Sequence, residues 1–389
     1  MLSPASQMIA TPSQRSRSWV LILAIAAGTV AAQGGPAAQP YQVGGVMDGA
    51  GLTAVDAGYL MAVQMACFSA AVLVASRFVD RTSLPALALS GATLAAGCYL
   101  VEFGLRTLLP LYLAAGTSGT GHGLIYAATV AAGSRASDPE RVFGAGTALG
   151  LIGLGVELAV LPLVGVRLGP MGVFAGLAAM LVLLVPLLPG LGRANAAPLR
   201  ETAGRVDIVG AAALVAVTAL FGIGTGAVYT FTERIATALD IDPAATGLVL
   251  TVGMMSGSLG GAAAAWAGNR LGRRLPLQLG LLASGLACLA IGVANGFWGF
   301  AAAVVAYGIT YIFPFPYFLG AGGALDRSGR LPAFANGMIF IASAVGSGAG
   351  GMIAVQWSYR TLGLLALAAS ILAAGLVPVV TSRAVEPAP

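Results

Sequence analysis

Long apolar runs separated by short polar segments make up almost all of this chain. Most runs are about twenty residues long, the length that a helix needs to cross about 30 Å of hydrocarbon at about 1.5 Å per residue. Gly and Ala are abundant and strand-like alternation is weak, which favours helices over a β-barrel. The pattern predicts an all-α integral membrane protein with twelve transmembrane helices. The predicted spans are 18–46, 53–76, 84–104, 107–133, 141–165, 169–190, 206–232, 243–266, 275–295, 297–320, 332–355 and 361–381.

The composition supports the same class of protein. Hydrophobic residues account for 58% of the chain and charged residues for 8%, whereas a soluble domain carries about 25% charged residues. So few charges cannot cover a surface in water, and the lipid bilayer must therefore be a partner. Twelve spans with short connections use up nearly all of the 389 residues, which leaves no room for a soluble domain.

Several activities are disfavoured by the residue types that the chain lacks. All 19 basic residues are Arg, so the chain has no phosphate-binding loop of the type that needs a Lys, and an ion or solute gradient is the expected driving force. The arginines lie in short loops, which argues against nucleic acid as a partner. The single histidine, the absence of clustered acids in the spans and the spacing of the cysteines predict no metal, no cofactor and no enzymatic activity. The cysteines are Cys67, Cys98 and Cys288.

The placement of arginine predicts the orientation. With the N-terminus inside, fifteen arginines fall on the cytoplasmic side and four, Arg106, Arg167, Arg234 and Arg360, on the outer side, which is a strong positive-inside bias. We therefore expect a multi-pass protein of the inner (plasma) membrane with both termini cytoplasmic. The apolar run that reaches Ala32 could also be a signal peptide, but the helical pattern continues beyond it.

An internal repeat divides the chain into two halves. A shift of 189 residues aligns identical residues along both halves: Gly58 with Gly247, Met65 with Met254, Ser69 with Ser258, Arg81 with Arg270, and Arg141 with Arg330. Two six-helix halves related in this way form the parallel repeat of one large transporter class. The expected organisation is a cytoplasmic tail (1–17), a six-helix bundle (18–190), a cytoplasmic linker (191–205), a second six-helix bundle (206–381) and a cytoplasmic tail (382–389).

The loop after the eighth span carries a recognisable motif. Residues 265–274 read Ala-Trp-Ala-Gly-Asn-Arg-Leu-Gly-Arg-Arg, which resembles the G-x-x-x-D-R-x-G-R-R loop signature of the major facilitator superfamily. The matching loop of the first half, residues 76–83, is a weaker copy that keeps the Asp-Arg pair. The resemblance covers essentially the whole chain through helix count, repeat and paired loops. It implies two pseudo-symmetric six-helix bundles (an MFS-like fold) and a secondary transporter that works by alternating access.

The resemblance also implies a gate on the cytoplasmic side. In the family the first-half acid, here Asp80, helps to hold that side shut, and a carboxylate can do so by meeting the positive N-terminus of a helix from the other half. The expected partners are Arg141 and the start of the eleventh span near Pro332. Asn269 replaces the acid in the second half, which predicts a weaker contact between the halves there. The alternative is that these residues only orient the loops by their charge. The predicted gate set is Asp80, Arg81, Arg141, Asn269, Arg270 and Arg330.

Residues on four spans are candidates for contact with a solute, because the resemblance implies that the first, fourth, seventh and tenth helices line a central cavity. His122 and Tyr126 share a face of the fourth span. The 189-residue shift aligns them with Tyr311 and Phe315 of the tenth span, and we expect the two pairs to face each other. The candidate set is His122, Tyr126, Tyr307, Tyr311, Phe315, Gln33 and Gln39.

Each of these candidates has a plainer interpretation. An imidazole titrates near neutral pH, so His122 could bind a solute carboxylate or relay a proton; a packing histidine bonded to a backbone carbonyl is the alternative. Pro314 and Pro316 interrupt the tenth span and remove backbone donors, which is tolerated where protein or a cavity takes up the freed groups. The aromatic residues around them suit a ring-bearing or amphipathic solute, or else they serve helix packing.

Glu157 is the acid that lies most clearly inside a predicted span. A charged carboxylate in hydrocarbon costs several kcal/mol, so this side chain should be neutral, paired or in contact with water. We predict that Glu157, together with His122, couples proton binding to the conformational cycle; a protonated acid that bonds across a helix interface is the alternative. The acids near the outer helix ends are interpreted as surface or gate residues: Asp48, Asp56, Glu102 and Glu233.

The sequence thus predicts a monomeric, proton-coupled secondary transporter whose partners are lipid, protons and a small organic solute, aromatic or carboxylated. Proton-driven efflux of amphipathic drugs or metabolites is the alternative. It is disfavoured because residues 155–165 of the fifth span lack the G-P-x-x-G-G stretch of drug/proton antiporters in the superfamily. A non-transporting membrane sensor or an intramembrane enzyme is more remote. The sequence does not distinguish sodium from the proton as the coupling ion, or import from export as the direction of transport.

Overall fold

The computed structural model describes residues 12–136, 139–193, 207–268, 270–326 and 330–383. These residues form helices joined by short turns, with no strand among them. The elements are α1 (Pro12–Ala37), α2 (Gln39–Ala50), α3 (Ala54–Ser76), α4 (Leu84–Gly104), α5 (Leu108–Ser134), α6 (Pro139–Leu168), α7 (Gly172–Leu184), the 3-10 helix η1 (Val185–Arg193), α8 (Ile208–Thr230), α9 (Thr232–Ala238), α10 (Pro243–Ala267), α11 (Arg274–Gly292), α12 (Phe297–Ile312), α13 (Phe315–Leu325), α14 (Arg330–Gln356) and α15 (Tyr359–Arg383).

The described helices combine into twelve rods that cross the molecule, as the apolar runs predict. Four rods join two helices each, namely α1–α2, α7–η1, α8–α9 and α12–α13. Eleven segments of the described chain are long and apolar enough to span a membrane. The remaining rod, α5, is 27 residues long but carries Thr117, Ser118, Thr120 and His122, which lower its hydropathy. The all-α membrane fold expected from the sequence is confirmed.

Three rods contain a break between two α-helices, and only one break is expected from the sequence. Pro314 separates α12 from α13, as predicted for the tenth span. The first span was expected as one helix but breaks at Ala38, where Pro40 lacks the N–H group that would continue the helix. The seventh span breaks at Phe231, between α8 and α9, without a proline. The first and seventh rods correspond under the repeat, and the shift places the Ala38 break at Ala227, four residues before the break observed at Phe231.

The two halves have the same architecture. Adding 189 to the bounds of α3 (54–76) gives 243–265, and α10 is observed at 243–267. Packing follows the same shift, because α1 packs on α6 as α8 packs on α14, and α4 packs on α7 as α11 packs on α15. Between the halves, α3 packs on α14 and α10 packs on α6. The 189-residue shift relates α3 to α10 and α6 to α14, so the two contacts are equivalent with the halves exchanged. An approximate twofold axis between the halves produces this pattern.

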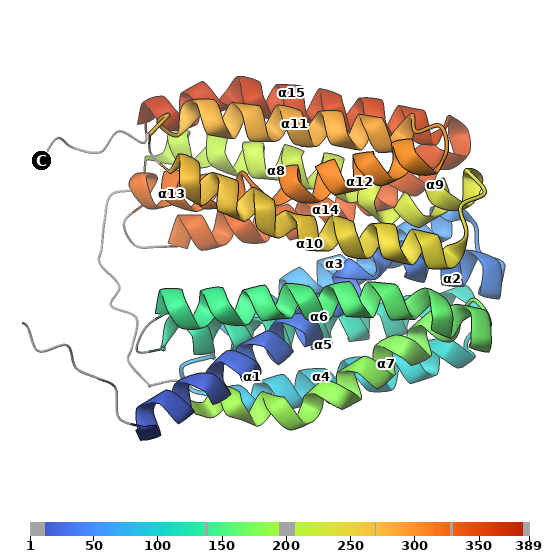
Figure 1. Cartoon of the computed structure of the whole chain (residues 1–389), viewed down its shortest axis with the longest axis horizontal. Coiled ribbons are helices and arrows are strands. Elements are labelled where there is room, and N and C mark those ends of the chain that lie inside the picture. The colour runs from blue at the N-terminus through green and yellow to red at the C-terminus, as the bar shows by residue number, and fades with distance from the viewer. Residues whose placement is uncertain (1–11, 137–138, 194–206, 269, 327–329, 384–389) are drawn as a thin grey trace, which may run out of the picture.

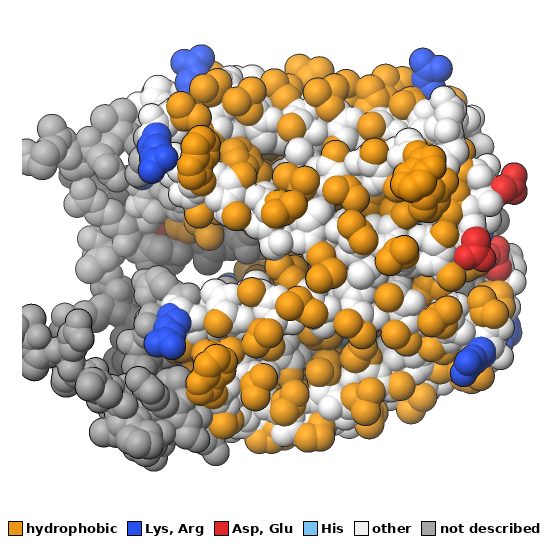
Figure 2. Space-filling view, viewed as in Figure 1, with side chains coloured by type: hydrophobic (Ala, Val, Ile, Leu, Met, Phe, Trp, Pro, Cys, Tyr) orange, Lys and Arg blue, Asp and Glu red, His pale blue; other side chains and the backbone are white. Residues whose placement is uncertain are grey.

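The surface of the molecule suits a bilayer. Figure 1 shows the halves one above the other, with the start of α1 and the end of α15 at the same end of the molecule. Large apolar side chains cover the outside of the rods, and charged side chains in this view lie near the two ends (Figure 2). On this face, lipid can therefore cover the middle of the rods without meeting a charge.

Glycines let the two halves approach closely. A β-carbon on Gly58 of α3 would lie 2.6 Å from the carbonyl oxygen of Ser347 on α14. One on Gly247 of α10 would lie 2.9 Å from Pro162 of α6. Because the repeat aligns Gly58 with Gly247, the same small residue serves both contacts between the halves.

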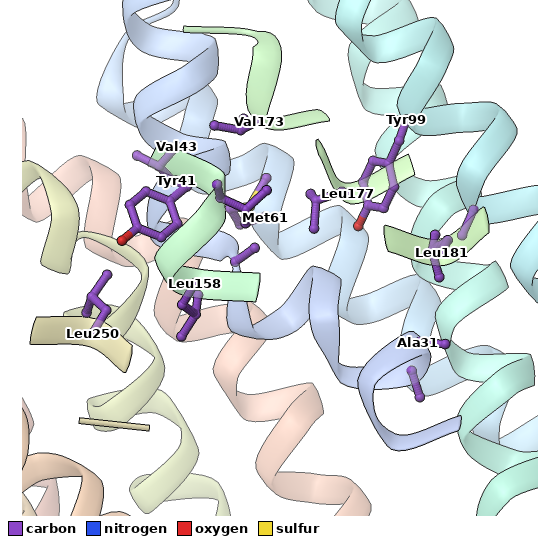
Figure 3. Packing of buried hydrophobic residues seen from close by; sticks show 14 of the residues in the cluster. Ala31, Tyr41, Val43, Met61, Tyr99, Leu158, Val173, Leu177, Leu181 and Leu250 are labelled. Carbon is purple, nitrogen blue, oxygen red and sulfur yellow. The ribbon is translucent and has the colours of Figure 1, made fainter. Parts of the chain in front are cut away.

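The contact between α6 and α10 is continuous with the largest buried apolar cluster. Figure 3 shows Tyr41 of α2 and Leu158 of α6 near Leu250 of α10. All three side chains are buried. The cluster continues into the first half through Met61 and Tyr99, so this contact is anchored in the core of the first bundle.

We predict that Gly58→Ala destabilises the protein. The added methyl group would press against the Ser347 carbonyl, and overpacking of this kind costs about 1–3 kcal/mol. Thermal unfolding of the purified protein in detergent should show a lower Tm. Gly97→Ala is the matched control, because an added β-carbon there meets nothing within 4 Å, and it should not lower Tm. Equal Tm values for the two variants would contradict the importance of this contact.

Candidate functional site

One end of the molecule is closed by an ion pair between the halves. Arg234 of α9 donates two hydrogen bonds to Asp48 of α2, Nη1 to Oδ1 and Nη2 to Oδ2, each 2.8 Å long. Its neighbour Glu233 accepts from the same guanidinium at Nε (2.6 Å) and at Nη2 (2.9 Å). Two of the acids interpreted from the sequence as surface or gate residues, Asp48 and Glu233, therefore lie at a contact between the halves. We call the contacts that join the halves at this end the outer closure.

Hydrogen bonds at the breaks of the first and seventh rods extend the outer closure. The break after α1 leaves the Ala37 carbonyl outside the regular helical pattern, and the Tyr229 hydroxyl donates to it at 2.6 Å. Thr230 donates to Gln39 Oε1 at 3.2 Å, and its hydroxyl lies 2.7 Å from that of Ser347. These bonds join α8 of the second half to both α1 and α2 of the first.

The opposite end is hollowed between the halves (Figure 2). There Asp80, which follows α3, forms an ion pair with Arg135, which follows α5. The sequence analysis expected Arg141 and the helix start near Pro332 as partners, so the partner of Asp80 is corrected to Arg135. The reason is that α3 and α5 are packed neighbours within the first bundle, so their ends meet while the halves are apart. On the predicted orientation, the open end is the cytoplasmic one.

The rest of the predicted gate set belongs to the same end. Arg81 and Arg270 are exposed, and the Arg270 guanidinium lies 5.8 Å from the ring centroid of Trp266. Arg141 is exposed near the start of α6. Two members have side chains that the structure does not describe: Asn269 and Arg330. A contact between the gate residues of the two halves stays a prediction, for a conformation in which this end of the molecule is closed.

Glu157 of α6 is buried, and neither of its carboxyl oxygens has a hydrogen-bond partner among the described residues. It lies against α1, where a β-carbon on Gly34 would come within 2.7 Å of both oxygens. Gly34 is one turn before the break at Ala38, so the acid touches the helix whose end takes part in the outer closure. No described group compensates an ionised carboxylate here, which favours the neutral acid in this conformation.

His122 of α5 is held on both sides inside the first bundle. Its Nδ1 lies 2.7 Å from the Ala31 carbonyl oxygen of α1, and its Nε2 lies 2.7 Å from the Tyr99 hydroxyl of α4. A carbonyl oxygen only accepts, so Nδ1 carries a proton, and Nε2 of the neutral ring accepts from Tyr99. The Tyr99 oxygen accepts in turn from Gln64 at 3.3 Å. This is the geometry of the alternative interpretation, a histidine bonded to a backbone carbonyl.

His122 and Tyr126 diverge although they are one turn apart. His122 points toward α1 and α4, whereas Tyr126 packs with Phe68 of α3 and Phe340 of α14, at ring-centroid distances of 5.6 Å and 6.0 Å. The expectation that both face the Tyr311 side of the second half is therefore corrected for His122. Four residues advance a helix by about 400°, so the two side chains differ by about 40°, which lets different neighbouring helices take them up.

Aromatic rings of the second half form one continuous stack. Tyr229 stacks on Tyr307 at 5.9 Å and 15°, and Tyr307 stacks on Tyr311 at 5.5 Å and 27°. Tyr311 continues the stack onto Phe221 at 5.4 Å and 19°, and Phe315 stands edge-on to Tyr311 at 5.3 Å. The structure thus brings together three predicted residues, Tyr307, Tyr311 and Phe315. Tyr229 and Phe221 were not predicted, because their spacing in the seventh span carries no aromatic pattern.

The glutamines of the first rod have separate environments. Gln39 belongs to the outer closure, and Gln33 is partly buried on α1. Gln42, which the sequence analysis did not single out, donates to the Gly35 carbonyl at 2.7 Å and accepts from Gln64 at 2.9 Å. A β-carbon on Gly35 would lie within about 2.5 Å of His122 Nε2, so α1 is in direct contact with the histidine.

Glu102 of α4 is completely buried, which corrects its interpretation as a surface or gate residue. Its Oε1 accepts from the Ser118 hydroxyl at 3.4 Å, and its Oε2 has no hydrogen-bond partner among the described residues. Gln64 Nε2 lies 3.3 Å from the same Ser118 hydroxyl. The signal in the sequence was its position inside the predicted span 84–104, with other polar side chains at similar depth on neighbouring spans.

This polar network has no counterpart in the second half. The 189-residue shift aligns Gln64, Tyr99, Glu102, Ser118 and His122 with Gly253, Cys288, Ile291, Tyr307 and Tyr311. It also aligns Glu157 with Gly346. The same scaffold therefore carries protonatable groups in its first copy and aromatic rings in its second.

Comparison with known proteins identifies the fold. No family model matches the sequence, and no curated protein matches it. The crystal structure of the nucleoside transporter NupG matches with a TM-score of 0.73 at 14% identity, covering 94% of this chain and 98% of that one. A mutant of NupG matches with a TM-score of 0.73 at 15% identity, covering 94% and 99%. The chain has the fold of this nucleoside transporter, so the all-helical two-bundle fold expected from the sequence is confirmed.

We predict that Asp48→Asn weakens the outer closure. Loss of an ion pair on the order of 1 kcal/mol changes a two-state ratio about fivefold. A cysteine introduced at Thr230 should then react about fivefold faster with a membrane-impermeant thiol reagent, after subtraction of the reaction of the native cysteines. Arg106→Ala is the control, because Arg106 bonds only to backbone carbonyls of its own half. Unchanged reactivity in Asp48→Asn would show that the ion pair does not hold the closure.

Proposed function

We propose that this protein is a secondary transporter that moves a small solute across the membrane by alternating access. The observation that carries the proposal is the joining of two like halves by an ion pair and hydrogen bonds at one end, with a hollow between them at the other. Rocking about the α3–α14 and α6–α10 contacts would part the closed end and join the open one. The fold shared with a nucleoside transporter supports this function.

Glu157 couples a proton to this motion. It touches α1 at Gly34, and the Ala37 carbonyl at the end of the same helix accepts the Tyr229 hydroxyl of the outer closure. While the closure is formed, Glu157 has no described donor, so it must keep its proton. When the halves part at this end, water can reach the acid and the proton can leave. Proton binding therefore favours the arrangement with the outer end closed.

The solute is ring-bearing and uncharged. The stack of Tyr229, Tyr307 and Tyr311 can receive a flat ring, and one aromatic contact of this kind contributes about 0.5–1.5 kcal/mol beyond burial. The described arginines all lie in loops or near helix ends, and both nitrogens of His122 are engaged. A carboxylated solute would therefore meet no cation in the middle of the described rods. Nucleosides, the solutes named for the matching transporter, belong to the ring-bearing class.

Uptake into proteoliposomes tests the function and its coupling together. Uridine, adenosine, benzoate and glucose are offered with and without an imposed pH gradient. We expect uridine or adenosine to accumulate when the gradient is present, and benzoate and glucose to be excluded. Accumulation of benzoate alone, or of none of the four, would overturn the proposed solute class.

We predict that Glu157→Gln abolishes the stimulation by the pH gradient while solute exchange without a gradient persists. The amide imitates the neutral acid, so the cycle can run but no proton is bound or released. The ratio of uptake with and without the gradient should fall to about 1, since coupling is lost. Asp240→Asn is the control, because Asp240 is an exposed acid at a positive φ that Asn tolerates. Full gradient dependence in Glu157→Gln would remove this acid from the mechanism.

We predict that Tyr311→Leu raises the KM for the transported ring-bearing solute about threefold to tenfold, because one stacking contact is lost. The folded structure should be kept, since Leu retains much of the apolar volume. Phe313→Leu is the matched control: it lies on the same rod, but its ring packs toward Gly280 of α11 and outside the stack. An equal rise in KM for both variants would point to general damage to the tenth rod.

A further inference from the structure

A second acid of the first bundle is buried as deeply as Glu157 and takes no part in the mechanism above. Glu102 has 0% of its surface exposed, and its Oε2 meets no hydrogen-bond partner among the described residues. The single described donor to its carboxyl group is the Ser118 hydroxyl. One weak hydroxyl donor does not compensate a buried carboxylate, so the free Oε2 is the natural place for a proton.

Few other titratable groups face Glu102. Cys98 and Tyr99 lie about one turn earlier on α4, and Ser118 and His122 lie on the adjacent α5. The other elements packed on α4, namely α7 and the described side chains of η1, carry no titratable group. Arg106, beyond the end of α4, is exposed and donates to two backbone carbonyls instead. No described cation therefore stands ready to stabilise an ionised Glu102.

Ser118, Gln64 and Tyr99 connect Glu102 to the histidine. The Ser118 hydroxyl lies 3.4 Å from Glu102 Oε1 and 3.0 Å from the Ala115 carbonyl oxygen, and Gln64 Nε2 lies 3.3 Å from the hydroxyl oxygens of both Ser118 and Tyr99. The Tyr99 hydroxyl donates to His122 Nε2 at 2.7 Å.

We propose that Glu102 is a second proton-binding site, joined to His122 by a hydrogen-bond network of Ser118, Gln64 and Tyr99. The proton is held on Oε2, while Oε1 accepts from Ser118. When water reaches the carboxyl group, the O–H bond can break and the proton pass to water, which leaves the carboxylate. At the other end of the network, Nδ1 of His122 donates to the Ala31 carbonyl of α1.

Helix α1 packs directly against Tyr99 and His122 of this network. A β-carbon on Gly35 would lie 2.3 Å from the Tyr99 hydroxyl and 2.5 Å from His122 Nε2. The preceding residue, Gly34, lies against Glu157. Two adjacent glycines thus place α1 against Glu157 on one side and against the Tyr99 and His122 end of the network on the other, so a movement of α1 changes the surroundings of both.

Infrared difference spectra between neutral and acidic pH test the site without a solute, on the full chain in liposomes. Glu102→Gln should remove one carboxyl band that is shielded from hydrogen exchange, and Glu157→Gln should remove a different one. Ser118→Ala should shift the Glu102 band, because it removes the hydrogen bond to that carboxyl group. Thr120→Ala, whose hydroxyl bonds within α5 to Gly116, is the control and should not shift it.

Two results would overturn the site. The first is a Glu102→Gln spectrum identical to that of the parent protein. The second is an equal band position in Ser118→Ala and Thr120→Ala, which also decides the question if Glu102→Gln does not fold. Loss of the Glu102 band together with the Ser118→Ala shift supports the proposal.

A second measurement addresses the use of the site in transport, which rests on the proposed function. The number of protons moved per solute in proteoliposomes should fall in Glu102→Gln while exchange without a gradient persists. An unchanged ratio would overturn the participation of Glu102 in the cycle. If the parent protein moves none of the offered solutes, the proposed function fails, and the infrared result still decides whether the proton site exists.

Discussion

Hydrocarbon forms no hydrogen bonds, so each polar group of this protein at membrane depth must find a partner inside the protein or carry a proton. Helices satisfy most of the backbone. The break after α1 is tolerated because the opposite half supplies a donor, Tyr229, to the Ala37 carbonyl. The same constraint keeps Glu157 neutral while the outer closure is formed. A partner that belongs to the other half can leave when the halves move, which makes these positions suitable for a gate and for a proton.

Two kinds of contact join the halves, and they suit different roles. The α3–α14 and α6–α10 contacts bring backbones together at Gly58 and Gly247, where close approach leaves little freedom to separate. The outer closure instead consists of one ion pair and a few hydrogen bonds, each of about 0.5–1.5 kcal/mol net. The glycine contacts can therefore act as pivots, while the polar contacts form and break during a cycle.

The repeat provides the same scaffold twice, but its two copies carry different chemistry. Buried acids and a histidine occupy the first bundle, and the aligned positions of the second bundle hold small, apolar or aromatic residues such as Ile291 and Tyr311. In the proposed function, the first half would bind the proton and the second half would contact the ring of the solute. Because Tyr229 of the aromatic stack also bonds α1, the two halves of the site are physically connected.

The sequence by itself determined the properties that depend on long runs of residues: the twelve rods, the two like halves and the proline break of the tenth rod. These follow from hydropathy and local backbone chemistry, which need no knowledge of neighbours. Only the tertiary structure decided that His122 faces α1, that Glu102 is buried and that Asp80 pairs with Arg135. Each of these depends on how far a helix is rotated about its axis and which helix lies beside it, and a rotation of about 40° is enough to change the partner.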